Sequence, residues 1–345
     1  MRIGYIAPVC CALFLFPIST ATAAEVSVKQ TKELKGAIAV SPDFSQYAER
    51  IEKAHPNYDY GVKIKEVTSG KELKKLEWDK DWGKPQRASF SSDGKKLAIF
   101  ALRYDGATSA KVFDLASGEM KLNVRHSLLE FVAFTPDSKR LASAGGPGAS
   151  EPAQTLWIWD IETRKKIVTE SPAKPECLAF SPDGKLVVAA PGKYGNEPLL
   201  VFCESATGKI IATIGKEEKE DEYVVDVAVS PNGKLVALAT RRPSAADGII
   251  KLFDAGTGKK IATFDDIQEQ IGGVAFHPRL NLLGATGNDK TIRFWDLGSE
   301  KLVSTTRLPK RDLYLRLQFS TDGTQCATCT TIGDTITLWN VEVKK

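Results

Sequence analysis

The sequence lacks the strong charge bias and the histidine clusters that mark several common classes of protein. Lys and Arg number 47 against 43 Asp and Glu, so the net charge is only +4. Proteins that bind nucleic acid by neutralising phosphates usually carry a larger positive excess, and we expect no nucleic-acid partner. The chain has only three histidines, and no two of them have metal-ligand spacing. We therefore expect no bound metal and no cofactor.

The chain also lacks an apolar run long enough for a typical membrane-spanning helix, which needs about 20 residues. The longest run, Ile3 to Ile18, contains Pro8 and Pro17 and follows Arg2. The small residues Ala21-Thr22-Ala23 after it fit a signal-peptidase site. We predict that residues 1–23 are a secretory signal peptide, with a membrane anchor as the alternative. The protein is then periplasmic or secreted, with no membrane span after cleavage.

Cysteine is scarce for an exported chain. Four cysteines follow the predicted leader, namely Cys177, Cys203, Cys326 and Cys329, too few for a disulfide scaffold. Cys326-x-x-Cys329 matches half a zinc site or a redox pair, but positions i and i+3 of a strand point to opposite faces. We interpret the four residues as small buried thiols.

What the sequence does contain is one unit repeated seven times. A turn related to Ser-Pro-Asp-Gly occurs at residues 41–44, 91–94, 135–138, 181–184, 230–233, 277–280 and 320–323, with spacings of 43 to 50 residues. These residue types fit the backbone angles of a type I turn. Apolar residues alternate before each turn, which predicts a β-strand.

Three further strands are predicted after each turn. The third ends in an aromatic and usually an acidic residue, as in Phe113-Asp114, Trp159-Asp160 and Trp295-Asp296. A turn such as Thr257-Gly258 then leads to a fourth strand. Four short strands at a period of roughly 46 residues are typical of one propeller blade.

The last unit has no fourth strand of its own, because too few residues follow Asn340. Residues 25–34 precede the first unit and belong to no other. As the outermost strand of the last unit, they would close the ring. We predict an all-β fold over residues 24–345, a seven-bladed β-propeller with four antiparallel strands per blade and an N-terminal closing strand at about 25–34.

The units resemble the WD40 repeat family over essentially residues 25–345, most strongly in Val274–Thr306 and Val132–Glu170. The family often carries a Gly-His pair ahead of the first strand, and here only His126 lies near that place. The first unit ends in Lys65-Glu66 instead of Trp-Asp. The His/Ser/Asp/Trp hydrogen-bond network that the resemblance implies is therefore expected to be partial.

Candidate binding residues come from the variable connections. The connections between the first and second strands and between the third and fourth strands of each unit are short and uniform. The connections between the second and third strands and between successive units differ in every copy. In the family the variable set forms one face, and variable loops on a rigid scaffold usually carry binding. The partner-binding candidates there are Trp82, Tyr104, Tyr194, Arg241, Arg242, Arg311 and Tyr314. Alternatively, these side chains pack against neighbouring loops or face water.

A second set of candidates lies four residues ahead of each turn, at the predicted mouth of the central channel. The set is Ala37, Arg87, Phe131, Cys177, Asp226, Gly273 and Arg316. Arg87, Asp226 and Arg316 break an otherwise uncharged ring. They either contact a partner or pair with one another as structural ions.

Motifs of enzymes are scarce, with no G-x-S-x-G elbow and no Gly-rich phosphate loop before a helix. The charged run 216–222 is interpreted as a solvated loop. The sequence thus predicts a monomeric, non-catalytic scaffold that binds a protein or peptide through its variable loops. The alternative is a propeller enzyme or small-ligand sensor whose carboxylates or histidines converge near Arg87, Asp226 and Arg316.

Overall fold

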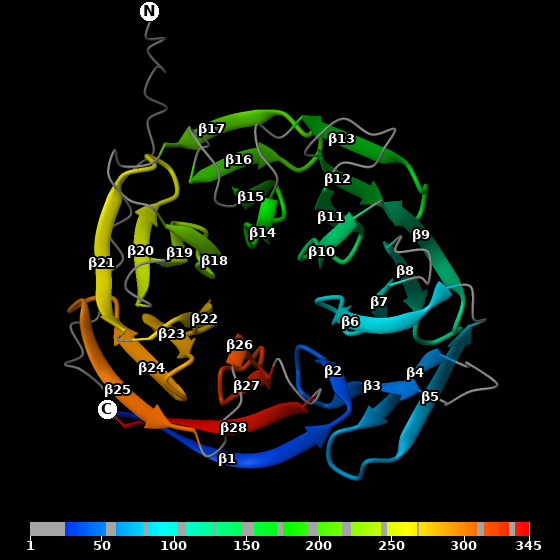
Figure 1. Ribbon diagram of the computed structural model, residues 1–345, viewed down its shortest axis with the longest axis horizontal. Helices are drawn as coiled ribbons and strands as arrows, with labels where there is room; N and C mark the ends of the chain where they lie inside the picture. Colours follow the sequence, from blue (N-terminus) through cyan, green and yellow to red (C-terminus); the bar gives the residue numbers. More distant parts are fainter. Residues whose placement is uncertain are drawn as a thin grey trace, which may run out of the picture.

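Seven four-stranded antiparallel sheets surround a common centre in the computed structural model (Figure 1). The structure describes residues 25–52, 60–78, 82–102, 108–126, 128–146, 155–170, 175–191, 199–215, 222–242, 247–267, 269–308, 314–330 and 335–344. These residues contain no helix long and apolar enough to cross a membrane. The predicted all-β, seven-bladed propeller is confirmed.

The first four blades follow one another along the chain. Blade 1 comprises β2 (Ala37–Val40), β3 (Gln46–Glu52), β4 (Tyr60–Glu66) and β5 (Glu72–Trp78). Blade 2 comprises β6 (Lys84–Phe90), β7 (Lys96–Leu102), β8 (Thr108–Asp114) and β9 (Met120–His126). Blade 3 comprises β10 (Leu128–Phe134), β11 (Arg140–Gly146), β12 (Thr155–Asp160) and β13 (Lys166–Glu170). Blade 4 comprises β14 (Pro175–Phe180), β15 (Leu186–Pro191), β16 (Leu200–Glu204) and β17 (Ile210–Ile214).

The last three blades complete the ring. Blade 5 comprises β18 (Tyr223–Val229), β19 (Leu235–Arg241), β20 (Gly248–Asp254) and β21 (Lys260–Ile267). Blade 6 comprises β22 (Ile271–Phe276), β23 (Leu282–Gly287), β24 (Thr291–Asp296) and β25 (Lys301–Arg307). Blade 7 comprises β26 (Tyr314–Phe319), β27 (Gln325–Thr330), β28 (Thr335–Lys344) and β1 (Glu25–Lys35).

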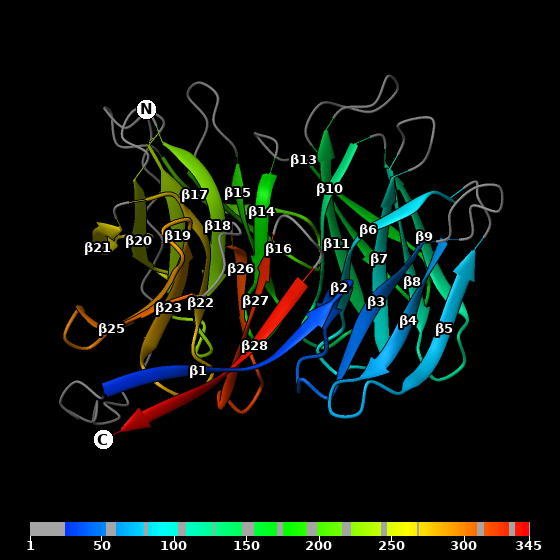
Figure 2. The same ribbon diagram turned by 60° about the horizontal axis from the view of Figure 1, so that its bottom comes forward.

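The ring is closed by the N-terminal strand, as predicted. β1 pairs antiparallel with β28 from Glu25 opposite Lys344 to Lys35 opposite Thr335, and the two strands lie side by side in Figure 2. Val26 and Leu34 are buried. The last blade therefore joins the two ends of the chain, which leaves no gap between the first and last blades.

The repeated turn is held by one set of hydrogen bonds. In blade 4 the Ser181 hydroxyl donates to Asp183 Oδ1 at 2.6 Å and accepts from the backbone N–H of Leu186 at 2.9 Å. Asp183 Oδ1 also accepts from the N–H of Lys185 at 3.1 Å. These bonds favour the charged carboxylate and lower the pKa of Asp183. They explain why the sequence repeats Ser and Asp two residues apart.

In blade 6 a histidine, His277, replaces the serine at the start of this turn. The Nδ1 of His277 accepts from the backbone N–H groups of Arg279 and Leu280 at 3.1 and 3.0 Å, and its Nε2 lies 3.0 Å from the carbonyl oxygen of Gly323 in blade 7. His277 is buried, and burial lowers its pKa. Its role in the fold is therefore to fasten two neighbouring blades.

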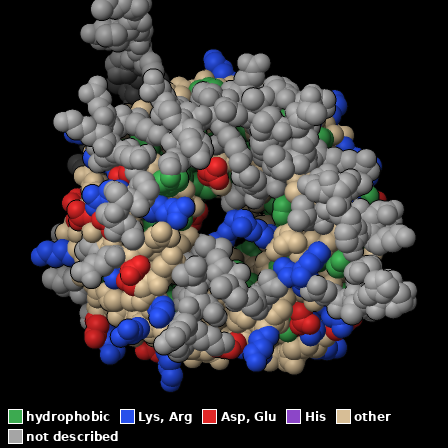
Figure 3. All heavy atoms as spheres, viewed as in Figure 1, with side chains coloured by type: hydrophobic (Ala, Val, Ile, Leu, Met, Phe, Trp, Pro, Cys, Tyr) green, Lys and Arg blue, Asp and Glu red, His purple; other side chains and the backbone are tan. Residues whose placement is uncertain are grey.

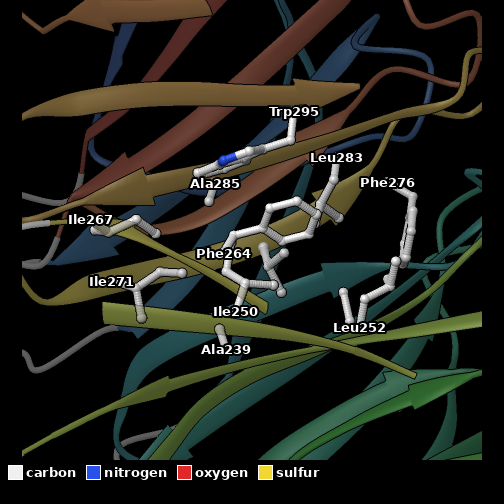
Figure 4. Close-up of a cluster of buried hydrophobic side chains, with 12 residues drawn as sticks. Ala239, Ile250, Leu252, Phe264, Ile267, Ile271, Phe276, Leu283, Ala285 and Trp295 are labelled. Atoms are coloured by element: carbon white, nitrogen blue, oxygen red, sulfur yellow. The ribbon is translucent and has the colours of Figure 1, made fainter. Parts of the chain in front are cut away.

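Apolar side chains pack between adjacent sheets. Between blades 5 and 6, Ile250 and Leu252 of β20 lie with Leu283 and Trp295 of blade 6 in one buried cluster (Figure 4). Phe264 adds a ring 5.6 Å from that of Trp295. Because both faces of a blade are covered in this way, burial of apolar surface is the main stabilising contribution between blades.

The tryptophan hydrogen bonds expected from the family resemblance are present in only some blades. Trp159 Nε1 donates to Ser143 at 3.2 Å, and Trp339 Nε1 donates to Thr328 at 3.0 Å. Trp295 Nε1 finds no acceptor among the described residues. The register explains this, because Ala285 stands in blade 6 at the place that Thr328 holds in blade 7.

Blade 1 replaces that hydrogen bond with an ion pair. Lys65 stands in the tryptophan position, and its Nζ lies 2.6 Å from Glu49 Oε2 on the neighbouring strand. The hydrogen bond to Glu49 and burial act in opposite directions, and together they leave the pKa of Lys65 raised. The blade that lacks Trp-Asp in the sequence thus keeps a polar link between its second and third strands.

Cys177, Cys203, Cys326 and Cys329 have free thiols. The first three are buried, as interpreted from the sequence, whereas Cys329 is only partly buried, so that interpretation is wrong for Cys329. Burial raises the pKa of Cys203 to about 11 and that of Cys326 to about 12. Thiols with such pKa values hold almost no thiolate at neutral pH, so they act as small packing groups.

Candidate functional site

Antiparallel pairing places the two kinds of connection at opposite ends of the blades. Turns such as 181–186 and 204–209 leave from one end, which we call the plain face. Connections from second to third strands and from blade to blade leave from the other end, which we call the loop-rich face. The first strand of each blade starts at the loop-rich face, and the residues four ahead of the turn lie in the first half or at the middle of that strand.

A β-bulge recurs beside this channel position. The pairing register shifts directly before the channel residue in six blades, at Pro85/Arg87, Leu129/Phe131, Pro175/Cys177, Val224/Asp226, Ile271/Gly273 and Tyr314/Arg316. In blade 1 the shift falls between Ala37 and Ala39. A bulge increases local twist and re-aims the side chains beside it. These bulges were not predicted from the sequence, although Pro85 and Pro175 were a signal for two of them.

A pocket of about 330 Å³ opens at the channel mouth between blades 7, 1 and 2. Its lining consists of Ala37, Ile38, Arg50, Lys84, Gln86, Arg87, Ala88, Arg316, Cys329 and Thr330. The described lining therefore contains four basic side chains and neither an acidic residue nor a histidine. The space-filling view shows Lys and Arg side chains close to the central opening (Figure 3).

Two of the predicted channel residues, Arg87 and Arg316, meet in this pocket, and both are exposed. Blade 1, which lies between their blades, contributes Ala37 at the same position. Arg50 reaches across the blade boundary and donates from Nη2 to the carbonyl oxygen of Gln86 at 3.2 Å. The pocket thus forms where the small Ala37 of blade 1 lies between Arg87 of blade 2 and Arg316 of blade 7.

Asp226, the third charged channel residue, is engaged with the backbone. Its Oδ1 accepts from the N–H of Val227 and its Oδ2 from the N–H of Val274, each at 3.0 Å. Burial raises the pKa of Asp226 to about 6, while the charge of Arg316 and the two hydrogen bonds oppose that rise. Because Val274 belongs to the next blade, Asp226 ties blade 5 to blade 6.

Trp82, one of the predicted partner-binding residues, is buried, so the alternative in which its side chain packs against its neighbours holds for it. Its side chain is 4% exposed and packs in the core cluster of blades 1 and 2. Its Nε1 donates to the hydroxyl of Ser109, Lys111 Nζ lies 4.0 Å from the ring centre, and Trp78 makes an edge contact at 4.3 Å. Ser109 and Lys111 both belong to β8, so that strand covers the indole.

The two adjacent arginines of blade 5 both have partners. Arg241 Nη1 donates to Gln270 Oε1 at 3.1 Å, and its guanidinium lies 5.2 Å from the ring centre of Tyr223. Arg242 makes a two-pronged ion pair with Asp247, which raises the pKa of Arg242, yet its side chain stays 43% exposed. Arg242 can therefore meet a partner in a fixed orientation.

Four candidates cannot be placed in this way. Tyr314 begins strand β26, and its side chain lies outside the description. Tyr104, Tyr194 and Arg311 lie outside the described residues. Their predicted role in partner binding stays a prediction.

Blade 5 also contains a buried ion pair that was not predicted from the sequence. Lys251 Nζ lies 3.1 Å from Glu222 Oε2, with both side chains 2% exposed, and the hydroxyl of Thr240 donates to the same oxygen at 2.7 Å. The interpretation of 216–222 as a solvated loop is thus wrong for Glu222. The signal was Lys251 itself, a charge inside an otherwise apolar strand. Among the residues that the structure describes, no group of three or more metal-ligating side chains gathers.

Known proteins share this repeat. The sequence profile of the family described as WD domain, G-beta repeat matches residues 258–296, within blades 5 and 6. The chain is 29% identical to mouse WD repeat-containing protein 1 over 178 residues and 26% identical to WD repeat-containing protein VIP3 of Arabidopsis thaliana over 135 residues. The same signature residues end the third strand in several of the seven blades. The chain is a WD40-repeat β-propeller.

These matches cover 50% and 35% of this WD40 propeller, and 27% and 40% of the two relatives. Nuclear distribution protein PAC1-1 of Uncinocarpus reesii is 32% identical over 125 residues, which are 32% of this chain and 28% of that protein. The chain thus spans less than half the length of these curated relatives. WD40 propellers typically bind proteins and are usually non-catalytic.

Proposed function

We propose that this WD40 propeller is an exported, non-catalytic scaffold that binds a protein or peptide at the loop-rich face. The family likeness supports a binding role. The leader-like residues 1–23 support export. Export predicts that the protein recovered from the periplasm or medium begins at Ala24, which mass spectrometry of the intact chain would test. A protein that keeps Met1 in the cytoplasm would contradict it.

The choice of the loop-rich face as the binding face rests on the contrast between the channel mouth and the turns of the plain face. The turns of the plain face repeat the same Ser and Asp hydrogen bonds from blade to blade. The channel mouth instead presents the exposed Arg87 and Arg316 in a pocket bounded by three blades. A surface that departs from the repeat on a rigid ring is where specific recognition is expected.

The alternative, a catalytic or sensing site, required carboxylates or histidines beside Arg87, Asp226 and Arg316. The described lining of the channel-mouth pocket contains none, and Asp226 is held by two backbone N–H groups. A general base needs access to the proton that it removes. The described geometry therefore favours binding over proton transfer.

Capture with face-specific variants tests the proposal. The purified chain without residues 1–23 would be immobilised and exposed to an extract of the cell envelope. Arg87→Gln with Arg316→Gln alters the loop-rich face, whereas Lys185→Gln with Arg279→Gln alters exposed turn residues of the plain face by the same charge. We expect the first pair to reduce capture of specific partners at least tenfold and the second to leave it unchanged. The reverse pattern would exclude the loop-rich face as the binding face.

A further inference from the structure

We infer that β17, the outer strand of blade 4, pairs antiparallel with the β17 of a second copy of this chain. The interaction goes beyond the proposed function and departs from the monomer predicted from the sequence. β17 is the last strand of its sheet and lies at the rim of the ring (Figure 1). Among the described residues no strand pairs with its outer edge. Such an edge presents backbone N–H and C=O groups with which another strand can pair.

The composition of β17 distinguishes it from the other outer strands. Within their described bounds, β1, β5, β9, β13, β21 and β25 all contain charged side chains, whereas β17 consists of Ile-Ile-Ala-Thr-Ile and contains none. Charged residues, lysine above all, are a common means of keeping an exposed edge from pairing. The edge without this protection is rich in β-branched residues, which favour strands.

The packing of β17 fixes its ends and exposes its middle. Ile210 packs against the buried cluster between blades 3 and 4, and Ile214 packs against the cluster between blades 4 and 5. The three residues between them are exposed. Ile211, at 51%, is the most exposed large apolar side chain among the described residues. Pairing with another strand would remove part of this apolar surface from water, which is favourable.

A second copy of β17 is complementary to this edge. Two identical strands can pair antiparallel about a twofold axis at Ala212, the middle residue. Ile210 of one copy then lies opposite Ile214 of the other. Ile211 likewise lies opposite Thr213. Every such pair joins β-branched or small residues, and no charged side chain is placed opposite another, so the cross-strand contacts are favourable.

The same arrangement is less favourable for other outer strands. A twofold pair of β9 strands about their middle residue would place Lys121 opposite Arg125. The equivalent pair of β25 strands would place Lys301 opposite Arg307. Like charges directly opposite each other are destabilising. Charge therefore selects the edge of blade 4 over these two edges for contact with a second copy.

The resulting assembly is a closed and weak dimer. A twofold contact uses the same edge on both copies, so it does not continue into a filament. Two edges of five residues are small beside the about 1,200 to 2,000 Å² of a stable interface. We therefore expect a Kd of about 100 μM. The two four-stranded sheets of blade 4 would join into one continuous sheet.

Sedimentation velocity of the chain beginning at Ala24, which retains every described strand, measures self-association. The mean mass should rise from that of the monomer toward twice that value as the protein concentration is raised through the expected Kd. A constant monomer mass at every concentration would overturn the inference.

Matched lysine variants locate the contact. Thr213→Lys adds a charge to the edge of β17 and should weaken association at least about tenfold, because charged edge residues oppose pairing. Lys75 holds the same register position in β5, so an outer strand accepts lysine there. Thr263→Lys is the control, since Thr263 is exposed at that position in β21, and it should leave association unchanged. Thermal melting confirms that each variant is folded.

Cysteine variants test the register. Residues directly opposite each other on paired strands have Cβ atoms about 4.5 to 5.5 Å apart, close to the spacing that a disulfide needs. Ala212→Cys should therefore form a covalent dimer under mild oxidation with copper phenanthroline, seen on a non-reducing gel. Ala262→Cys, at the equivalent position of β21, and the wild type should form none.

Other results would also overturn the inference. Association that survives Thr213→Lys, or that Thr263→Lys abolishes equally, would place the contact elsewhere. Covalent dimers of Ala262→Cys as abundant as those of Ala212→Cys would exclude the twofold register. A monomeric chain whose β17 amides gain protection from hydrogen exchange only with a captured partner would assign the edge to a strand of that partner. The proposed binding face is tested separately, by capture with the arginine variants.

Discussion

The two faces of the ring differ in how they use the repeat. On the plain face, Ser181 and Asp183 of blade 4 make the same hydrogen bonds as Ser320 and Asp322 of blade 7. On the loop-rich face, the channel position holds an arginine in blades 2 and 7 but Asp226 in blade 5. Residues that repeat therefore fix the architecture, and residues that break the repeat are the ones to examine for function.

A comparison of blades 2 and 5 shows that breaking the repeat is not sufficient for a binding role. Lys111 and Lys251 occupy matching positions, opposite Ile99 and Leu238 of the second strands. Lys111 lies over the buried ring of Trp82, whereas Lys251 pairs with the buried Glu222. Trp82 and Glu222, which lie next to connections between blades, are both buried. Burial therefore distinguishes residues that break the repeat for structural reasons from exposed residues that are candidates for binding.

The largest effect is expected from truncating the covered indole. Trp82→Ala should destabilise the ring by about 3–5 kcal/mol, because it removes a buried aromatic side chain and leaves a cavity. Denaturation by urea would measure the loss. Partner capture by the fraction that stays folded should be unchanged. Normal stability with lost capture would instead show Trp82 to be an exposed contact.

The buried pair of blade 5 should be nearly as sensitive. Glu222→Gln removes the negative charge facing Lys251 and should cost about 3 kcal/mol, since it leaves an uncompensated buried cation. Replacing both residues by Leu and Met should recover much of that loss, because no buried charge remains. Additive losses in the double variant would show that the two side chains do not interact.

The channel carboxylate predicts a dependence on pH. The folded-state pKa of Asp226 is raised from 3.8 to about 6, so the folded state favours the protonated acid. Its unfavourable contribution is absent below about pH 4, grows as pH rises from about 4 to 6 and is complete above that, at about 3 kcal/mol. Relative to Asp226→Asn, the wild type should therefore gain stability as pH falls from 7 to 4.5. Parallel melting curves for both proteins across that range would contradict the raised pKa.

The smallest effect is expected at a single repeated turn. Ser181→Ala removes the hydroxyl that links Asp183 to Leu186 and should cost about 1 kcal/mol. Ser92→Ala, at an exposed position of the equivalent turn in blade 2, serves as the control. A loss as large as that of Trp82→Ala would mean that the turns, rather than the packing between blades, dominate stability.

The sequence alone predicts the architecture because the same short turn and strand pattern recurs seven times. The closing strand follows from the same pattern, since residues 25–34 were left without a blade. Glu222 and Trp82 could not be placed, because each lies next to a connection between blades, where no repeat fixes the direction of the side chain. The bulges that place Arg87 and Arg316 are shifts in the pairing of two strands, which the sequence of a single strand does not display.

Hydrogen exchange of the propeller with and without its captured partner tests the binding face most directly. Amide protection reports which backbone segments a partner covers or stabilises. The account predicts added protection at residues 84–88 of β6 and 314–317 of β26, beside the channel-mouth pocket, and none in the turns at 41–46 and 181–186. Protection confined to those turns would show that the partner binds the plain face and would contradict the account.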